Sequence, residues 1–213
     1  KVSFAPVFTF DQAMKGGGVG VSIRSENVSQ IPKVRNNVDL TFVCREDHPD
    51  FKELSPIGVY INEIPGFGEC DADLRVKDSR EGWAEALRWV IDAHYDGIES
   101  LVIDVSDVRP RGSDIKGFGG VASGPAPLVE MLAKVNDILN RRVGDYVTPT
   151  EWGDIIQHIG CCVVAGNVRR TALILIGDPD DQEFIESKNY TLEKNKAASQ
   201  WRWASNNSIT ITP

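Results

Sequence analysis

Residues 165–176, AGNVRRTALILI, are the stretch from which we interpret this chain. The segment starts with a small residue, glycine and asparagine, continues through two arginines and ends in an apolar run. Gly166 and Asn167 tolerate the backbone angles of a tight loop. The guanidinium groups of Arg169 and Arg170 each carry donors that suit phosphates and base edges. The order predicts a cationic loop that runs directly into a buried strand, and a surface turn with two solvated arginines is the alternative.

The composition is that of a globular, acidic protein. The 213 residues are 41% hydrophobic and 25% charged, with a net charge of −8, which allows one large domain or two small ones. A sequence-independent nucleic-acid binder needs a basic face, so we expect no DNA partner. No apolar run approaches the ~20 residues of a membrane-spanning helix, and residues 1–10 do not resemble a signal peptide. We therefore expect a cytoplasmic protein without a membrane partner.

The cysteines indicate a reduced chain rather than a metal site. Cys44, Cys70, Cys161 and Cys162 follow neither a zinc-binding nor a C-x-x-C spacing, and the adjacent pair does not readily form a disulfide. Both ends of the sequence are strand-like and lack the polar tails common at termini. This pattern predicts a piece of a larger fold.

Periodicity and turn residues predict helices that alternate with strands. Strands are expected over residues 2–10, 21–23, 40–43, 57–61, 101–106, 171–176 and 208–212. Helices are expected over 78–96, 127–142, 149–163 and about 178–188, with a short helical turn at 11–14 and a polar, mobile connection at 191–200. Glycine-rich loops after strands favour a mostly parallel α/β sheet or barrel, with ligands at the strand ends.

Two of the helices carry clear boundary signals. Thr148 and Glu151 form a capping-box pattern with Pro149 at the first helical position. Asp78 with Glu81 is expected to cap the preceding long helix in the same way. His94 falls on the apolar face of that helix, so we expect a packed histidine rather than a ligand.

Two glycine-rich segments are candidates for binding an anion. Lys15 precedes four glycines in the five positions 16–20, which allow close backbone approach and leave amides free. This segment matches neither a dinucleotide fingerprint nor a P-loop, and a flexible hinge is the alternative. Residues 107–127 bring Arg109, Arg111 and Lys116 into a second glycine-rich stretch, where surface solvation is the alternative.

Four segments, in order, resemble the catalytic subunit of ribonucleotide reductases. They are FDQAMKGGGVGVSI, SDVRPRGSDIKGFGGVASGPAPLVEML, VVAGNVRRTALILIGDPDDQEFIESK and WRWASNNSITI. The resemblance is closest to the class II, adenosylcobalamin-dependent, monomeric ribonucleoside-triphosphate reductases, and only residues 40–78 match poorly. It implies an α/β fold in which residues 1–213 form the central part of a ten-stranded barrel. A possible insertion or effector-side region would lie at about 38–97.

The resemblance implies reduction of ribonucleotides, with triphosphates favoured, by thiyl-radical chemistry. In this family adenosylcobalamin generates the radical on a finger-loop cysteine, and a thioredoxin-type reductant renews the electrons. The finger-loop pattern Asn-Pro-Cys-x-Glu is absent from this chain, and none of its cysteines matches a family catalytic cysteine. We therefore expect no catalytic residue here, a cofactor bound mainly by segments outside this chain, and other polypeptides that carry the rest of the barrel.

The resemblance also assigns binding roles to the glycine-rich and cationic segments. AGNVRR matches the specificity loop between effector and substrate, and the helices that carry Trp83 and Leu128 are expected to form the effector-side surface. The ribonucleotide substrate is assigned to Gly17, Gly18, Gly20, Asn167, Arg169 and Arg170. The deoxynucleotide effector is assigned to Lys15, Ser22, Arg111, Lys116 and Gly166. The alternatives are a non-catalytic nucleotide-binding regulator and a class I reductase that uses a separate radical-generating subunit.

Overall fold

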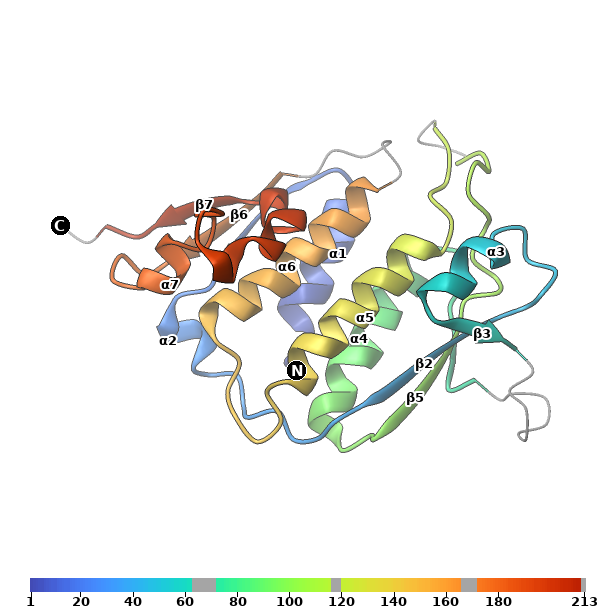
Figure 1. Ribbon diagram of the computed structural model, residues 1–213, viewed down its shortest axis with the longest axis horizontal. Helices are drawn as coiled ribbons and strands as arrows, with labels where there is room; N and C mark the ends of the chain where they lie inside the picture. Colours follow the sequence, from blue (N-terminus) through green and yellow to red (C-terminus); the bar gives the residue numbers. More distant parts are fainter. Residues whose placement is uncertain (63–71, 116–119, 166–171, 212–213) are drawn as a thin grey trace.

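The computed structural model describes residues 1–62, 72–115, 120–165 and 172–211. Two sheets flank a layer of helices (Figure 1). A three-stranded sheet has the order β1-β6-β7 and a four-stranded sheet the order β3-β2-β5-β4. Every pairing described between these strands is parallel, which confirms the predicted α/β class with parallel sheets. The strands are β1 (Gly18–Ser22), β2 (Asp39–Cys44), β3 (Val59–Ile61), β4 (Leu74–Arg75), β5 (Ser100–Asp104), β6 (Ala172–Gly177) and β7 (Asn206–Ile209).

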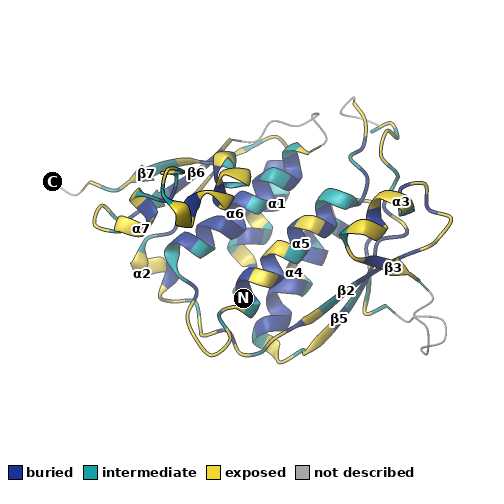
Figure 2. Ribbon diagram, in the orientation of Figure 1, coloured by how far each residue is buried: buried dark blue, intermediate teal, exposed yellow. Residues whose placement is uncertain are grey.

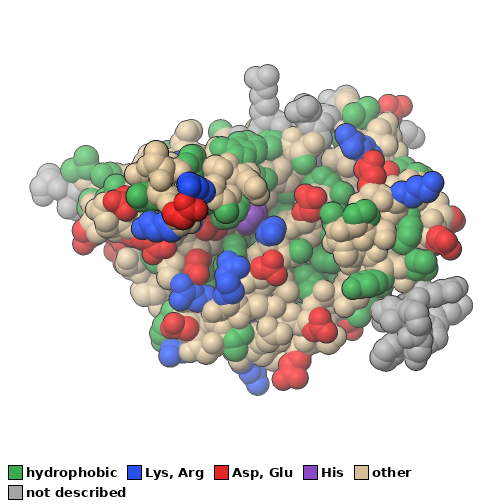
Figure 3. Space-filling model, viewed as in Figure 1, with side chains coloured by type: hydrophobic (Ala, Val, Ile, Leu, Met, Phe, Trp, Pro, Cys, Tyr) green, Lys and Arg blue, Asp and Glu red, His purple; other side chains and the backbone are tan. Residues whose placement is uncertain are grey.

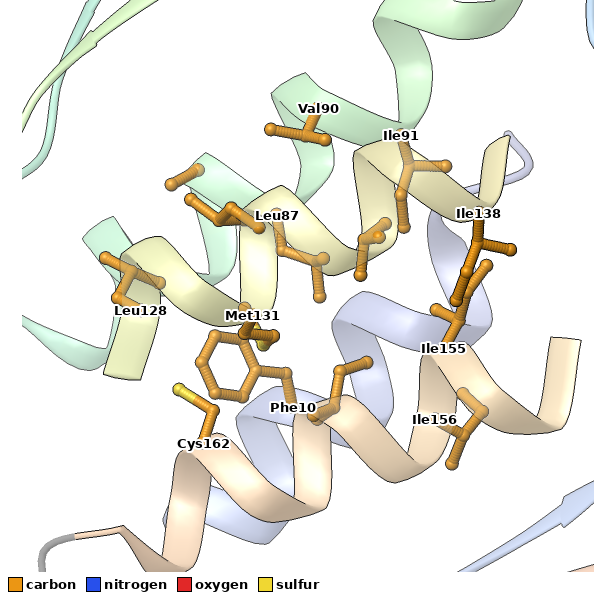
Figure 4. Packing of buried hydrophobic residues seen from close by; sticks show 14 of the residues in the cluster. Phe10, Leu87, Val90, Ile91, Leu128, Met131, Ile138, Ile155, Ile156 and Cys162 are labelled. Carbon is orange, nitrogen blue, oxygen red and sulfur yellow. The ribbon is translucent and has the colours of Figure 1, made fainter. Parts of the chain in front are cut away.

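Four long helices form the layer between the sheets. They are α1 (Phe4–Met14), α4 (Arg80–Asp96), α5 (Ala126–Asn140) and α6 (Pro149–Val164). The core lies where their apolar faces meet, and side chains from all four helices interlock there (Figure 4). The facing sides of α4, α5 and α6 are buried while their outer sides are exposed (Figure 2). Short elements connect them: α2 (Ser25–Val28), α3 (Phe51–Leu54), α7 (Gln182–Ile185) and the 3-10 turns η1 (Ser55–Ile57), η2 (Glu193–Asn195), η3 (Ala197–Gln200) and η4 (Arg202–Ala204).

Local sequence signals explain α6 fully. The Thr148 hydroxyl accepts a hydrogen bond from the Glu151 amide at 3.2 Å, and the Glu151 carboxylate accepts one from the Thr148 amide at 3.0 Å. This is the predicted capping box, with Pro149 at the first helical position. The helix then buries an apolar face that includes Trp152 and Ile155.

The N-terminal cap of α4 differs from the prediction by one residue. Ser79, rather than Asp78, caps the helix, and its hydroxyl accepts a hydrogen bond from the Gly82 amide at 3.0 Å. Asp78 instead binds Arg109 from the β5–α5 segment. The helix ends as expected at Gly97, whose φ of 84° places it in the left-handed region.

His94 is a packed histidine, as predicted. Its side chain is fully buried, and its Nε2 atom lies 3.0 Å from the Asn136 Oδ1 atom. Burial lowers the pKa of His94, because an apolar environment disfavours the charged imidazolium. The histidine therefore links α4 to α5 as a neutral group.

The predicted strand over residues 2–10 is wrong, because this stretch forms α1. Its aromatic and β-branched residues favour strands only where they fit a sheet surface. Here Pro6, Phe10 and Met14 recur at helical spacing and are buried against α4 and α6. Phe4 and Phe8 lie on the outer side and stack with ring centroids 6.2 Å apart.

The C-terminal part is more compact than the sequence indicates. The helix predicted to about residue 188 stops at Ile185, and residues 191–200 include the turns η2 and η3 rather than a loose connection. Asn195 is buried there, and its amide donates to the Glu186 carbonyl oxygen at 2.8 Å. Tertiary hydrogen bonds of this kind leave no signature in local sequence.

Surface charge is mixed rather than concentrated. Acidic and basic side chains alternate over the face shown in Figure 3, with apolar atoms between them. Among the residues with described coordinates, none of the helices has both the length and the apolar character required to cross a bilayer.

Candidate functional site

A cleft of about 130 Å³ lies where α1, α4 and α6 meet the segment between β5 and α5. Its walls are apolar: Phe10 and Met14 come from α1, Trp83 from α4, and Cys162 and Val163 from the last turn of α6. The Phe10 and Cys162 side chains lie close together at one end of the helix layer in Figure 4. Val108, Ile115 and residues 121–124 also line it, and its polar part is formed by Asp78, Ser79, Arg80 and Arg109.

The shape of the cleft limits what it can hold. Pockets that enclose whole drug-sized ligands measure roughly 300–1,000 Å³. A volume of about 130 Å³ accommodates one ring system, so the rest of a larger ligand would extend outside. The Trp83 ring supplies a flat surface for such a ring and packs against Phe10 with centroids 6.4 Å apart.

Two arginines stand at the edge of the cleft and are held by carboxylates. Arg109 Nε lies 2.8 Å from Asp78 Oδ2, and the Arg109 amide donates to Asp78 Oδ1 at 3.2 Å. Arg80 lies 2.8 Å from Asp11 and also contacts Glu81. Arg80 is the first residue of α4, where the helix dipole favours negative charge. The edge therefore combines cationic donors with a helix N-terminus, next to an apolar wall.

The three cysteines with described coordinates are poor nucleophiles. Burial raises the pKa of the Cys44 and Cys161 thiols to about 11 and raises the pKa of Cys162 further. A thiol attacks as its thiolate, so these groups are inert near neutral pH. Cys162 contributes an apolar surface to the cleft.

The predicted glycine site lies at the start of β1. Gly18 pairs with Ala172 at the start of β6, and the Gly17 amide donates to the Gln12 carbonyl oxygen at 3.0 Å. A Cβ atom at Gly17 would lie 3.1 Å from Gln12 O, and one at Gly20 would lie 3.2 Å from a methyl group of Ile174. At these two positions glycine already has a packing role.

Among the predicted effector residues that the structure describes, Lys15, Ser22 and Arg111 do not lie in one site. Lys15 lies at the C-terminal end of α1, before β1, whereas Ser22 is the last residue of that strand, which by itself spans about 13 Å. Lys15 binds Asp11 at 2.6 Å, whereas the Ser22 hydroxyl accepts a hydrogen bond from Asn27 at 2.7 Å. Arg111 is exposed and its guanidinium lies 3.7 Å from Glu53.

Other predicted residues cannot be placed. Lys116 and Gly166, assigned to the effector, lie outside the described residues, as do Asn167, Arg169 and Arg170, assigned to the substrate. These assignments stay predictions. Sequence reasoning missed Arg80 as a cleft residue because it stands in a helix far along the chain from the glycine-rich segments. Arg109, considered there only as a possible anion contact, lines the cleft.

Comparisons with known proteins agree with the fold. Residues 38–139 match the family described as B12-dependent ribonucleotide reductase, insertion domain. This range covers the four-stranded sheet together with α4 and α5. The expected insertion at about 38–97 starts at the same residue, and its limits stay a prediction.

Two similar relatives carry the same name. The chain is 44% identical to an adenosylcobalamin-dependent ribonucleoside-triphosphate reductase of Lactobacillus acidophilus and 43% identical to one of Lactobacillus leichmannii, over 99% of this chain. It superposes with a TM-score of 0.87 and 40% identity on a crystal structure of a B12-dependent (class II) ribonucleotide reductase, over 98% of this chain. The chain spans 29% of the length of each of these relatives. Over nearly its whole length the chain corresponds to a part of the class II, B12-dependent ribonucleotide reductases.

Proposed function

We propose that this chain is part of a ribonucleoside-triphosphate reductase and supplies surfaces that bind a deoxynucleotide effector and select the substrate. The observation that carries this proposal is a direct connection between the cleft and the glycine-rich strand. Val163 lines the cleft, and Ala172 pairs with Gly18 a few residues later in the chain. The intervening residues contain the AGNVRR segment that resembles the family's specificity loop.

The cleft has the chemistry that an effector nucleotide requires. A base would lie against Trp83 in the apolar part, where one ring system fits. The phosphates would extend to Arg80 and Arg109, which provide charge-assisted donors beside the N-terminus of α4. An acidic protein needs such a local concentration of cations to hold a polyanion.

The substrate would lie at the other end of the connection. Gly18 and Gly20 are on the exposed face of β1, and the backbone is most open to a ribose at Gly18, because the Ile174 side chain borders Gly20. Arg169 is the first candidate for a substrate contact and Arg170 the second. A change in the segment between cleft and strand would pass information from effector to substrate, since both ligands would contact it.

Neither of two cavities among the described residues, with volumes of about 130 and 480 Å³, is large enough by itself to enclose a corrinoid, which is larger than a drug-sized ligand. We assign the cofactor, the radical-bearing cysteine and the contact with a thioredoxin-type reductant to parts of the enzyme outside this chain. The residues described here bind and orient nucleotides.

A binding experiment tests the proposal. The chain is titrated with dATP, dGTP, dCTP and dTTP in turn, with calorimetry as the readout. We expect saturable binding of at least one deoxynucleotide, weakened by Trp83→Ala. Failure of all four to bind would overturn the effector role.

A second experiment tests the reductase role. The chain is combined with the remaining segments of a homologous enzyme, and formation of deoxyribonucleotide is measured with and without adenosylcobalamin. We expect cobalamin-dependent turnover. Turnover that requires a separate radical-generating subunit instead would favour a class I enzyme, and no turnover in the complete assembly would favour a regulator.

A further inference from the structure

The β5–α5 segment that forms one wall of the cleft is held from behind by two buried side chains. His48 and Asp50 lie in the connection between β2 and α3, far in sequence from the wall they support. We propose that these two residues are positioning residues that fix the cleft wall and thereby set the affinity for nucleotide. This inference rests on the proposed effector role of the cleft.

The His48 side chain holds the start of the wall by binding the wall's backbone. Its Nε2 atom lies 2.8 Å from the Val108 carbonyl oxygen, and its Nδ1 atom lies 3.1 Å from the Asp50 amide nitrogen. An amide nitrogen can only donate and a carbonyl oxygen can only accept. The neutral tautomer with its proton on Nε2 therefore satisfies both contacts. The side chain is only 6% exposed, so water does not replace these partners.

Asp50 holds the next part of the same wall. Its Oδ2 atom accepts a hydrogen bond from the Arg111 amide at 2.8 Å, and the residue is 9% exposed. Arg109 lies between the two anchored positions, Val108 and Arg111. Its side chain direction is thus fixed by the backbone on both sides and by Asp78.

The far end of the wall lies against the same carboxylate. Gly124 has a φ of 73°, and a Cβ atom there would lie 2.4 Å from Asp50 Oδ2 and 3.1 Å from the Arg111 amide nitrogen. Between these ends, the Gly112 amide donates to the Ala122 carbonyl oxygen at 2.9 Å. Asp50 is therefore the point at which both ends of the wall meet.

Loss of either anchor should loosen the wall locally. Removing the Asp50 carboxylate leaves the Arg111 amide without its acceptor, and removing the His48 ring leaves Val108 O without its donor. Arg109 then samples more positions in the free protein. Ligand binding must order this side chain, and the entropic cost of doing so weakens the affinity. Affinity drops even where the cleft residues themselves are unchanged.

The test compares two truncations, two conservative variants and one matched control. Asp50→Ala and His48→Leu remove the hydrogen-bonding groups, whereas Asp50→Asn and His48→Gln keep an acceptor and a donor respectively. Asn140→Ala is the control. The Asn140 side chain also binds a backbone, at Val38 N and O with distances of 2.9 and 3.0 Å, but at the opposite end of β2.

Two readouts are measured on each variant. The first is hydrogen exchange of the Gly112 and Ala122 amides, which are hydrogen-bonded within the wall. The second is the Kd for the deoxynucleotide that binds the unaltered chain. We expect about tenfold faster exchange and tenfold weaker binding in the truncations, recovery in the conservative variants, and no change in either readout for Asn140→Ala. Equal effects of Asn140→Ala and Asp50→Ala would show a merely structural role and overturn the proposal.

A double-mutant cycle adds a direct test of the shared carboxylate. Gly124→Ala should weaken binding in the unaltered chain, because the new methyl group meets Asp50 Oδ2. In the Asp50→Ala background that contact no longer exists, so the same substitution should cost clearly less. Additive effects would contradict the common anchor.

The outcomes separate this inference from the proposed function. Absence of nucleotide binding to the unaltered chain would overturn the effector role and the affinity part of the inference. Exchange at Gly112 and Ala122 would still decide whether His48 and Asp50 fix the wall. Normal binding with unchanged exchange in Asp50→Ala would overturn the inference alone.

Discussion

Asp154 and Arg202 form a buried ion pair that joins α6 to the turn η4. The guanidinium makes two hydrogen bonds to the carboxylate, at 2.7 and 2.9 Å, and both side chains are 10% exposed. Trp201 donates a third hydrogen bond to Asp154 from its indole nitrogen at 2.7 Å. The pair fixes the segment before β7 on the helix that leads toward the AGNVRR segment.

The first prediction concerns this pair. Arg202→Met leaves the Asp154 carboxylate buried without its charged partner, and breaking such a pair costs about 3–5 kcal/mol in the free energy of unfolding. Urea denaturation measures the loss. The exposed pair Lys196–Glu193 provides the control, because Lys196→Met should cost less than about 1 kcal/mol. A similar loss for both variants would contradict the special position of Arg202.

The second prediction concerns pH. His158 stacks on Trp201, and burial lowers its pKa from 6.5 to about 4. Between these values the unfolded chain binds a proton that the folded chain does not. Stability should therefore fall as the pH drops from about 6.5 to 4, by up to about 3 kcal/mol. His94 acts in the same direction, so His158→Gln should remove only part of the slope in pH-dependent denaturation. An unchanged slope would show that folding does not lower the pKa of His158.

The third prediction separates two glycines. A Cβ atom at Gly18 would lie 3.7 Å or more from its neighbours, an ordinary contact, so Gly18→Ala should change stability by less than about 1 kcal/mol. It should nevertheless weaken ribonucleoside-triphosphate binding, measured by equilibrium dialysis, if ribose passes over β1. In Gly177→Ala the new Cβ would lie 2.2 Å from the buried Phe184 ring, and overpacking should cost about 1–3 kcal/mol. Unchanged affinity in Gly18→Ala would indicate that this glycine serves the sheet alone.

The fourth prediction concerns phosphate recognition. Arg109→Gln removes a charge-assisted donor at the cleft, so triphosphate affinity should fall about tenfold or more, equivalent to about 1.4 kcal/mol. Affinity for the corresponding deoxynucleoside, which has no phosphates, should stay the same. Arg88→Gln, an exposed position on α4, is the matched control for lost charge. Equal losses for nucleotide and nucleoside would place Arg109 away from the phosphates.

Elements with complete local signals were predictable from sequence. The capping box at Thr148, the apolar stripe of α6 and the left-handed Gly97 all depend on residues within a few positions of one another. The strand β6 follows from its apolar run in the same way. Such features need no knowledge of the remaining chain.

The errors arise where tertiary contacts compete with local preference. Residues 2–10 have strand-forming side chains, yet packing of Phe10 against α4 and α6 favours a helix. Asp78 has the right type and position for a cap, but Arg109 engages its carboxylate and Ser79 takes that role. Neither competition can be read from one segment alone.

The segments that contribute to the site were predictable from the sequence, but their arrangement in space was not. The sequence indicates that glycine-rich stretches and arginines matter, and the structure places Val163 of α6 and Met14, which precedes β1 by four residues, in the lining of one cleft. The cleft itself depends on Trp83 and Arg80, which reach it through the packing of α4 on α1. The separation of Lys15 from Ser22 follows from strand geometry once β1 is known to start at Gly18.

The convergence of Arg111 and Gly124 on one carboxylate has an evolutionary consequence. When both ends of a surface segment are fixed at a single point, the residues between them can be exchanged, lengthened or shortened without moving the surrounding scaffold. Natural selection can then vary ligand preference within that interval while the helices and sheets stay constant. Asp50 thus holds together the two ends of an interval whose residues can change independently of the surrounding scaffold.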